Sequence, residues 1–349
     1  MGKKKVVGVI FGGQSGEHEV SLMSSYNVIK ALDREKYDIV MIGITKEGRW
    51  MIYRGPAERI QSGLWEEDRE NLIEGFSMDH PLIKSIDVVF PVLHGPRGED
   101  GTVQGVFELA NVPYVGCGVL ASAVGMDKVY SKALFEAAGL PQGKYLYIMR
   151  AKWRKEPEEA IRRIEEHLKY PIFVKPANMG SSVGISKVYN REELAAGLDQ
   201  AAKYDRKLLL EEGIQCREIE CAVLGNDDPQ ASILGEIIPS NEFYDYQAKY
   251  LDGGKSRLII PAPLDEETTE TIRKLAVKAF KAIDGSGLAR VDFFVEKNTG
   301  KVYINEINTL PGFTNISMYP KLWEHTGIPY SQLIDRLIQL AIERFEDSQ

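Results

Sequence analysis

The sequence of 349 residues has little cysteine, no long apolar run and no excess of positive charge, and each shortage excludes a class of protein. Its three cysteines, Cys117, Cys216 and Cys221, form no paired CxxC pattern, which argues against a disulfide framework or structural zinc and favours a reducing cytoplasm. No apolar stretch approaches the roughly 18 residues that span a bilayer. Forty-three Lys plus Arg against 51 Asp plus Glu give a net charge of −8, which argues against nucleic-acid binding. We therefore expect a soluble protein that binds neither membrane nor nucleic acid.

Several common catalytic motifs are also missing. No GxSxG elbow occurs, so a Ser-His-Asp hydrolase has no support. The loop GSSVG at 180–184 does not lead into a helix with Gly-Lys-Ser/Thr, so it is not a Walker P-loop. The GGQSG turn near the start lacks the GxGxxG spacing of a dinucleotide site, and we predict no NAD. Three lysines precede the first apolar run, but that run is too short for a secretion signal and reads as a strand.

The first third of the chain follows an alternating strand and helix pattern. The runs VVGVIF, YDIVMIGI and IDVVFPVLHG are typical of parallel strands buried on both faces. Residues 17–32 carry apolar side chains at helical spacing, and GEDGTVQGVFELANVPYVG predicts a helix of about ten residues followed by a short strand. Since about 100–200 residues make one domain, the chain has room for two or three. We predict a small parallel α/β domain over residues 1–123.

Antiparallel pairs replace the parallel units after Met126. The amphipathic segment MDKVYSKALFEAAGLP predicts a helix that stops at Gly139 and Pro141. Apolar strands flank the Gly/Ser loop, LLLEEGI and EIECAVLG suggest another strand pair, and LARVDFFVEKNTGKVYINEIN predicts a hairpin. A helix near 266–283 and a C-terminal amphipathic helix complete the pattern. The fold class is therefore α/β, with an α+β part that we divide into a central domain, 124–215, and a C-terminal domain, 216–349.

The predicted hairpin concentrates charged side chains on one face. A turn centred near Thr299 places Asp292 opposite Glu306, and Asn308 and Arg290 fall on the same face by the two-residue period of a strand. Two opposed carboxylates repel, and a cation between them removes the repulsion. Carboxylate and amide oxygens are hard ligands that suit Mg²⁺ bound jointly with phosphates, and Mn²⁺ accepts the same ligands. The hairpin therefore predicts a metal site.

Other candidate residues carry weaker signals. The small residues of the 180–184 loop let backbone N–H groups approach phosphate oxygens, although a tight hairpin loop also favours glycine. Lys128 and Lys175 add positive charge, and Lys175 interrupts an apolar strand, which is unusual for a surface lysine. Glu211 and Glu218 offer acceptors for an adenine or a ribose, or are simply charges in a turn.

Two further residues lie in the predicted N-terminal domain. Glu17 lies at a helix start, where the dipole favours a carboxylate, and it would suit a ligand ammonium. His94 ends a buried strand at a favoured ligand position.

Taken together, these segments resemble a known family. The ordered set GGQSGEHEVS, LHGPRGEDGTVQG, MDKVYSK, VKPANMGSSVGISK, EFYDYQAKY, LARVDFF and NEINTLPGFTNISMYP closely resembles the D-alanine:D-alanine ligases of the ATP-grasp superfamily. The match runs from about residue 6 to residue 340. The resemblance implies a three-domain ATP-grasp architecture and an enzyme that joins two D-alanines, with ATP, for peptidoglycan synthesis in the cytoplasm. It also implies two Mg²⁺ or Mn²⁺ ions and a homodimer formed through the N-terminal domain.

In such enzymes the first D-alanine carboxylate is phosphorylated, and the amine of the second D-alanine then attacks the acyl phosphate. The resemblance implies that the metal ligands are Asp292, Glu306 and Asn308. The residues that it implies for nucleotide binding are Lys128, Lys175, Gly180, Ser181, Ser182, Val183, Gly184, Glu211, Glu212, Ile214 and Glu218. The residues that it implies for catalysis and for the two D-alanine sites are Glu17, His94, Ser181, Lys249, Tyr250, Arg290, Gly312, Ser317 and Met318.

The resemblance also implies individual tasks for these residues. Glu17 pairs with the first substrate's ammonium in a hydrogen-bonded set with Ser181 and Tyr250, and His94 lines that pocket. Arg290 and the Gly312 N–H stabilise the oxyanion. Ser317 and the Met318 N–H take the second carboxylate, and Lys249 faces the transferred phosphate. No separate general base is obvious from the sequence.

Tyr250 bears on the choice of nucleophile. Ligases that make D-alanyl-D-lactate resemble this sequence but commonly carry phenylalanine or histidine at that position, so tyrosine favours an amine. A depsipeptide ligase or another carboxylate-amine ligase remains the alternative, and a regulatory nucleotide-binding protein is a third possibility. We expect the loop at 237–256, which is polar and aromatic, to order over bound substrates and exclude water.

Overall fold

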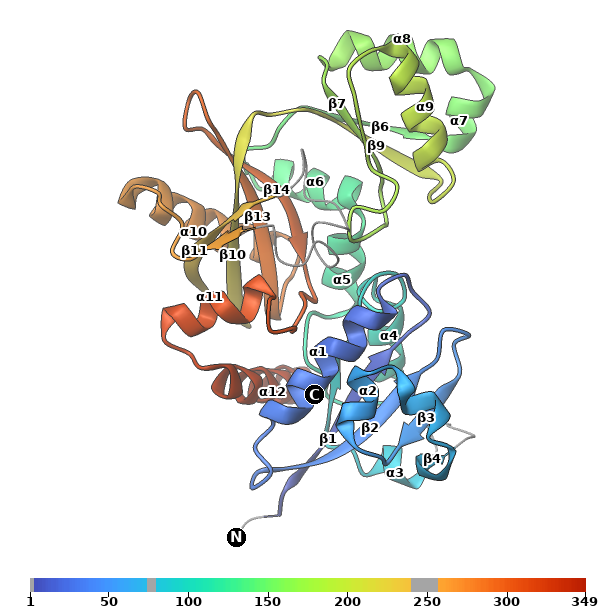
Figure 1. Ribbon diagram of the computed structural model, residues 1–349. Coiled ribbons are helices and arrows are strands. Elements are labelled where there is room, and N and C mark those ends of the chain that lie inside the picture. The colour runs from blue at the N-terminus through green and yellow to red at the C-terminus, as the bar shows by residue number, and fades with distance from the viewer. Residues whose placement is uncertain (1–2, 74–79, 240–256) are drawn as a thin grey trace.

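The computed structural model describes residues 3–73, 80–239 and 257–349, and these residues form three β-sheets with helices packed around them (Figure 1). The sheets follow one another along the chain. The first has the strand order β4-β3-β2-β1-β5, the second β6-β9-β7-β8 and the third β12-β11-β10-β13-β14. In Figure 1 the N-terminal sheet and the four-stranded sheet lie at opposite ends of the molecule, with the third sheet between them.

The N-terminal sheet contains the three predicted parallel strands, β1 (Lys5–Gly12), β2 (Tyr37–Ile44) and β5 (Val88–Pro91). Two unpredicted strands, β3 (Trp50–Tyr53) and β4 (Leu72–Ile73), extend it in antiparallel pairs. The predicted α/β fold class is confirmed, and the sheet is mixed because the sequence analysis did not predict this antiparallel edge. The physical reason is the short β2–β3 connection, which leaves no room for the crossover that parallel strands require.

Helix α1 (His18–Ala31) follows β1 as the spacing predicted. The helix predicted from GEDGTVQGVFELANVPYVG is α4 (Thr102–Leu109), and the strand expected after it is reduced to a single parallel bridge from Tyr114 to Val89. The remaining helices of this part are short: α2 (Ala57–Gln61), α3 (Pro81–Lys84) and the 3₁₀ turns η1 (Leu64–Glu67) and η2 (Arg69–Asn71).

The second sheet is fully antiparallel and belongs to the central part of the chain. Its strands are β6 (Tyr145–Met149), β7 (Ile172–Pro176), β8 (Ser186–Val188) and β9 (Lys207–Glu212). Its helices, which the sequence analysis did not identify, are α7 (Arg150–Lys155), α8 (Pro157–His167) and α9 (Arg191–Ala201). Helices α8 and α9 pack against this sheet through a buried apolar cluster that includes Ile164, Val174 and Leu198. The predicted antiparallel pairing across the Gly/Ser loop is confirmed by β7 and β8.

The pairing predicted between LLLEEGI and EIECAVLG is wrong. These segments form β9 and β10 (Cys216–Gly225), which lie in different sheets. β9 pairs with β6 and β7, whereas β10 pairs with β11 (Gln230–Ile238) and β13 (Gly287–Glu296). The short link between them is held from both sides, because the Gly213 N–H donates to the Pro171 carbonyl and the Lys297 N–H donates to the Gln215 carbonyl. The predicted turn is therefore the connection between two sheets.

The third sheet is completed by β12 (Arg257–Ile259) and β14 (Val302–Asn308), and its two faces differ in character. Ile219, Cys221 and Val223 of β10 join the apolar cluster of α10 (Glu266–Ala282). The intervening residues Ala222 and Leu224 pack instead in the cluster of α11 (Met318–Thr326) and α12 (Tyr330–Asp347). Because side chains alternate along a strand, Glu220 of β10 and its partner Asp292 of β13 share the face opposite α10.

Helices α5 (Val119–Met126) and α6 (Lys128–Ala137) connect the parts of the molecule. Both contact β14, and Asp127 caps α6 by accepting from the Val129 and Tyr130 N–H groups at 3.1 and 3.2 Å. Helix α12 contacts α1 and β5 on one side and β13 on the other. Within the described residues, we find no helix with the length and apolar character that a membrane span needs.

Candidate active site

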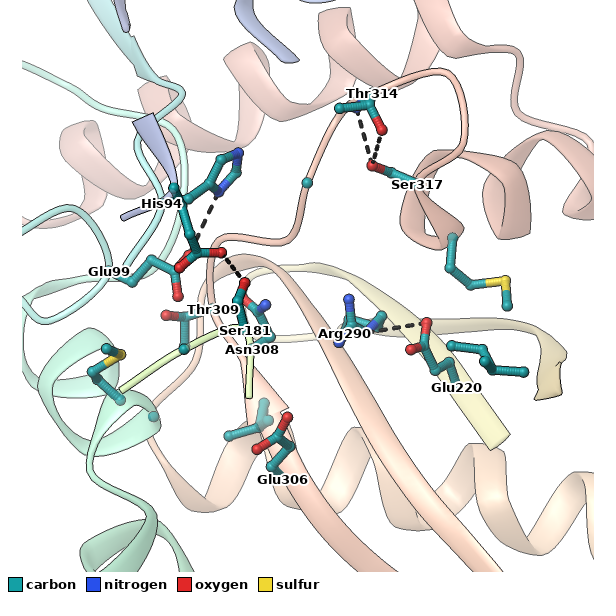
Figure 2. A pocket seen from close by; sticks show the side chains of 18 of the residues that line it. His94, Glu99, Ser181, Glu220, Arg290, Glu306, Asn308, Thr309, Thr314 and Ser317 are labelled. Carbon is teal, nitrogen blue, oxygen red and sulfur yellow. Dashed lines mark hydrogen bonds and ion pairs between the residues drawn. The ribbon is translucent and has the colours of Figure 1, made fainter. Parts of the chain in front are cut away.

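Two adjoining cavities lie between the three sheets and share lining residues that include Lys128, Gly180, Ser181, Arg290 and Glu306. The smaller cavity, of about 120 Å³, is also lined by Glu17, His94, Glu99, Asn308, Gly312, Ser317 and Met318. The larger cavity, of about 1020 Å³, lies between the central and third sheets. Figure 2 shows the smaller cavity, with His94 and Ser181 on one side and Arg290 and Glu220 on the other.

Three carboxylates form a row across the third sheet. The strand register pairs Glu220 on β10 with Asp292 on β13, and Asp292 with Glu306 on β14. Neighbouring strands lie about 4.8 Å apart, so these charges repel one another unless cations lie among them.

The guanidinium of Arg290 is the nearest of those cations. Its Nε and Nη2 atoms donate to the two oxygens of Asp292 at 2.8 and 2.7 Å, and its Nε lies 3.2 Å from Glu220 Oε2. Burial by itself would lower the pKa of Arg290, but the charges of Asp292 and Glu220 raise it well above its ordinary value. Glu306, on the next strand, has a second cation nearby, because its Oε2 atom lies 3.8 Å from Lys128 Nζ of α6. Arg290 thus remains charged where it lines both cavities.

The predicted hairpin register is confirmed at these residues, and a β-bulge explains why. Near the turn Phe294 pairs with Tyr303, a register displaced by one residue from the pairing of Asp292 with Glu306. The register shifts between Asp292 and Phe293, which restores the predicted pairing at the cleft. Asn308 faces Arg290 across the same two strands.

A buried carboxylate between two ammonium groups lines the larger cavity. Glu211 on β9 lies 2.6 Å from Lys132 Nζ and 2.6 Å from Lys175 Nζ. Burial alone would raise the pKa of Glu211, but the two lysine charges lower it to about 2. The pKa of Lys175 is raised, because the charges of Glu211 and Glu306 outweigh its burial. Lys175 therefore keeps its charge in the place where phosphates would lie.

Glu17 is held rigidly in the smaller cavity. It is the N-cap residue of α1, and the Ser181 hydroxyl of the Gly/Ser loop donates to its Oε1 atom. A Cβ added at Gly95 or Gly180 would lie only 2.9 or 2.8 Å from Glu17 Oε2, so both backbones must pass close to the carboxylate. His94 lies behind it, with Nδ1 3.5 Å from Glu99 Oε1.

Glu99 also fixes the loop that carries His94, because its Oε1 accepts from the Gly95 N–H at 3.1 Å. Burial lowers the pKa of His94, but the hydrogen bond and charge of Glu99 and the charge of Glu17 raise it overall. The site therefore favours a cationic imidazole more than an isolated histidine would.

The Gly/Ser loop is strained at its tip. Ser181, Ser182 and Gly184 have φ angles of 48°, 59° and 76°, in the left-handed region that favours glycine. The Val183 N–H donates to the Gly180 carbonyl at 3.2 Å. Such strain in a non-glycine residue is often found at a ligand-binding loop.

Asn178 anchors the base of this loop. Its backbone N–H donates to Asp205 Oδ2 at 2.8 Å, and its side-chain Nδ2 donates to the same oxygen at 3.1 Å and to Asp127 Oδ2 at 3.3 Å. Lys128 Nζ donates to the Met179 carbonyl at 2.8 Å. The sequence analysis attached no importance to Asn178, yet its side chain ties the loop to the residue that caps α6.

The structure brings most of the predicted residues together. All predicted nucleotide residues except Val183 and Gly184 line the larger cavity, which Asp292 also lines. Lys249 and Tyr250, and residues 240–256 of the predicted covering loop, lie outside the described residues.

Among the lining residues that the sequence analysis missed, three carried a signal in the sequence. Lys132 lies four residues after Lys128 on one helix face, Glu220 lies two residues after Glu218 on one strand face, and Glu99 follows His94 in the same loop.

The chemistry of the hairpin fits a divalent cation. Asp292 and Glu306 supply carboxylate oxygens and Asn308 an amide oxygen, and each carboxylate oxygen of Asp292 retains a second lone pair beside its bond to Arg290. Within residues 3–73, 80–239 and 257–349, protein side chains alone assemble no cluster of three His, Cys, Asp or Glu suited to a metal. A cation here would therefore need oxygen ligands from a bound nucleotide as well.

Comparison with known proteins agrees with this geometry. Family models described as the N-terminus and C-terminus of D-ala D-ala ligase match residues 6–117 and 134–339. This chain belongs to the D-alanine–D-alanine ligase family. Members of this family are ATP-dependent ligases, and the family resemblance found in the sequence is confirmed.

Relatives in this ligase family match over nearly their whole length. The D-alanine–D-alanine ligase of Acetivibrio thermocellus is 58% identical, with 100% of this chain and 98% of the relative covered. The solved D-alanine-D-alanine ligase of Coxiella burnetii has 38% identity and a TM-score of 0.88, with 100% and 97% coverage. The VanG D-Ala:D-Ser ligase of Enterococcus faecalis has 41% identity and the same TM-score, with 97% and 100% coverage.

The paired lysines around Glu211 lead to a stability prediction. Lys132→Met should lower the free energy of unfolding at pH 7 by about 3 kcal/mol, because it removes one cation from a buried carboxylate. The lowered pKa of Glu211 stabilises the fold above its ordinary value of 4.5, and this stabilisation is lost as pH falls toward about 2. Urea denaturation at pH 7 and pH 4 should therefore show a smaller difference from wild type at pH 4. An equal difference at both pH values would contradict this account.

The anchor of the Gly/Ser loop leads to a kinetic prediction. Asn178→Ala should raise the KM for ATP about fivefold to tenfold, since it frees the loop base that presents the phosphate-binding backbone. Asn190→Ala is the matched control, because Asn190 caps α9 in the same part of the chain and its side chain accepts from the Glu193 N–H at 3.0 Å. Steady-state kinetics that gave both variants the same KM for ATP would refute the anchoring role.

Proposed function

We propose that this protein catalyses the ATP-dependent ligation of two D-alanines to D-alanyl-D-alanine, with a D-alanyl phosphate intermediate, for peptidoglycan precursor synthesis. The observation that carries the proposal is the junction of the two cavities. A site with a fixed carboxylate, Glu17, and a charged guanidinium, Arg290, opens at shared residues into a larger cavity lined by lysines and a Gly/Ser loop. An amino acid fits the smaller cavity, and a nucleoside triphosphate fits the larger one.

The first step is phosphoryl transfer to the first D-alanine. Its ammonium pairs with Glu17, which places its carboxylate toward Arg290 and the shared residues. A carboxylate oxygen attacks the γ-phosphorus of ATP, the bond from that phosphorus to the β,γ-bridging oxygen breaks, and ADP leaves. Lys128 and Lys175, whose ammonium groups line the larger cavity, offset the phosphate charge.

The second step is acyl transfer. The neutral amine of the second D-alanine attacks the acyl carbon and an oxyanion forms. The carbonyl then re-forms, the bond from the acyl carbon to the phosphate oxygen breaks, and the leaving phosphate takes the proton that the attacking nitrogen loses. Arg290 and the Gly312 N–H line the smaller cavity and stabilise the oxyanion. Ser317 and the Met318 N–H at the start of α11 bind the second carboxylate, where the helix dipole favours an anion.

Asp292, Glu306 and Asn308 would hold Mg²⁺ or Mn²⁺ together with the nucleotide phosphates. When bound, such ions neutralise the charge that develops on the transferred phosphoryl group. Lys249 and Tyr250 lie in the motif EFYDYQAKY. Because this motif resembles that of the family, we assign Lys249 to the transferred phosphate and Tyr250 to the hydrogen-bonded set of Glu17 and Ser181.

The nucleotide assignments follow the lining of the larger cavity. The residues assigned there are Lys128, Lys175, Gly180, Ser181, Ser182, Glu211, Glu212, Ile214 and Glu218, with Val183 and Gly184 as parts of the same loop. Glu211 acts mainly by holding Lys132 and Lys175 in position.

We further propose the three-domain division at residues 1–123, 124–215 and 216–349, a homodimer formed through the N-terminal domain, and a cytoplasmic location. Each proposed domain contains one sheet, which supports the boundaries. The α5 and α6 contacts with β14 indicate that the segment around residue 124 is a structural bridge between domains.

The second candidate is a ligase that uses another nucleophile in the second step. Its support is the close structural likeness to the VanG D-Ala:D-Ser ligase. D-Serine differs from D-alanine by one hydroxyl, and a small apolar pocket discriminates weakly against such a group. D-Lactate is the corresponding nucleophile of a depsipeptide ligase.

The test is phosphate release and product mass with ATP, Mg²⁺ and D-alanine, alone or mixed with an equal concentration of D-serine or D-lactate. We expect D-alanyl-D-alanine as the main product in every mixture and none from L-alanine. D-Alanyl-D-serine or D-alanyl-D-lactate as the main product would replace the dipeptide assignment with the second candidate. Tight ATP binding without turnover would instead indicate a regulatory protein.

Glu17→Gln provides a sharper test of the first-substrate site. The variant should raise the KM for the first D-alanine at least tenfold, since a neutral amide replaces the charged partner of the ammonium, while the KM for ATP stays within twofold. Glu19→Gln is the control, because Glu19 lies on the same helix with an exposed side chain paired to Lys46. Unchanged constants in Glu17→Gln would remove Glu17 from this role.

A further inference from the structure

We propose that Ser24 and Asn27 of α1 are positioning residues that fix the Gly312 N–H at the distance from Glu17 that the first step and the oxyanion require. This inference rests on the proposed function and assigns a task to two residues outside the site described above. Phe313 directly follows Gly312 in the chain. Phe313 is 2% exposed, and its ring packs edge-on against Phe90 and Tyr330.

The backbone of Phe313 is held at both of its polar groups. Its N–H donates to Ser24 Oγ at 3.2 Å. Its carbonyl accepts from Asn27 Nδ2 at 3.2 Å and from the Tyr330 hydroxyl at 2.9 Å. Because peptide groups are planar, holding the N–H of Phe313 also fixes the plane of the peptide that joins it to Gly312. That peptide ends at the Cα atom of Gly312, to which the donor nitrogen is bonded, so α1 restricts where the Gly312 N–H can lie.

Ser24 also contacts the opposite wall of the smaller cavity. Its Oγ lies 3.3 Å from His94 Nε2, and Ser24 itself is fully buried. One hydroxyl therefore joins the loop after β5 to the segment that carries Gly312. This arrangement links two walls of the cavity that come from opposite ends of the sequence.

Helix α1 acts as the spacer between the two ends of the first-substrate site. Glu17 caps its N-terminus, and Ser24 lies seven residues further on, about 10 Å along the axis. The same rigid helix thus positions the carboxylate for the substrate ammonium and, through Phe313, the donor for the substrate carboxylate. Misplacing a catalytic donor by about 1 Å costs far more in turnover than in binding, because only the transition state needs the full geometry.

The test compares two neighbouring serines. Ser24→Ala removes the contact to Phe313, whereas Ser25→Ala removes a hydroxyl that is equally buried but donates only to the Leu22 carbonyl of its own helix, at 3.0 Å. In the full-length enzyme, Ser24→Ala should lower kcat for dipeptide synthesis at least tenfold and leave the KM values for ATP and first D-alanine within twofold. Ser25→Ala should keep kcat within twofold, and both variants should melt at similar temperatures.

Asn27→Ala provides a second variant if Ser24→Ala does not fold. Tyr330 still holds the Phe313 carbonyl in that variant, so we expect a smaller loss of kcat, about threefold, again without a change in KM. Equal kcat values in Ser24→Ala and Ser25→Ala, or in Asn27→Ala and wild type, would overturn the positioning role. Wild-type enzyme that makes no dipeptide would overturn the proposed function instead, so the two failures are distinguishable.

Discussion

The constraint on which the rest of the site depends is the repulsion among carboxylates that share one face of the third sheet. Glu220, Asp292 and Glu306 lie on adjacent strands, and the cleft is stable only with cations among them. Arg290 is a permanent cation in that row, and Lys128 approaches its far end. We propose that a divalent cation and a nucleotide phosphate would bind beside this row and neutralise each other. A cation bound together with the nucleotide would thus neutralise the carboxylate charge that Arg290 and Lys128 leave in excess.

The fold delivers the remaining groups to this row from separate parts of the chain. The first sheet ends at the loops that carry Glu17 and His94, and the second provides the strained Gly/Ser loop. Ser181 meets Glu17 across the junction, and Gly95 and Gly180 are required there because a larger residue would press on the carboxylate. The cavity therefore exists only when all three parts are in place, which explains why its residues are scattered between positions 17 and 318.

The sequence predicted those features that depend on local periodicity. The alternation of β13 and β14 predicted which face carries the proposed metal ligands, and the parallel strands and the helices α1, α6, α10 and α12 were placed correctly, whereas α7, α8 and α9 were missed. The pairing of Asp292 with Glu306 was also correct, although its local basis was not visible, since a bulge compensates a turn displaced by one residue. The pairing of β9 with β10 was wrong because two apolar strands joined by a short turn resemble a hairpin, and no local pattern reveals that each has a partner elsewhere.

Contacts between distant segments account for the residues that sequence reasoning missed. The importance of Ser24 follows from its contacts with Phe313 and His94, and that of Asn178 from its contacts with Asp205 and Asp127. Such serines and asparagines have no spacing that separates them from ordinary surface residues. The family resemblance predicts the groups that touch substrate, whereas the residues proposed to position them follow from contacts in the structure.

The central claim is that one cleft first activates a carboxylate by phosphorylation and then transfers the acyl group. The most direct test uses D-alanine with both carboxylate oxygens labelled by ¹⁸O, with mass analysis of the phosphate and dipeptide. The account predicts one ¹⁸O in each phosphate released and one ¹⁸O in the new peptide carbonyl, because the attacking oxygen leaves with phosphorus. Phosphate without ¹⁸O, formed together with dipeptide, would contradict an acyl phosphate and the arrangement of charge proposed for this cleft.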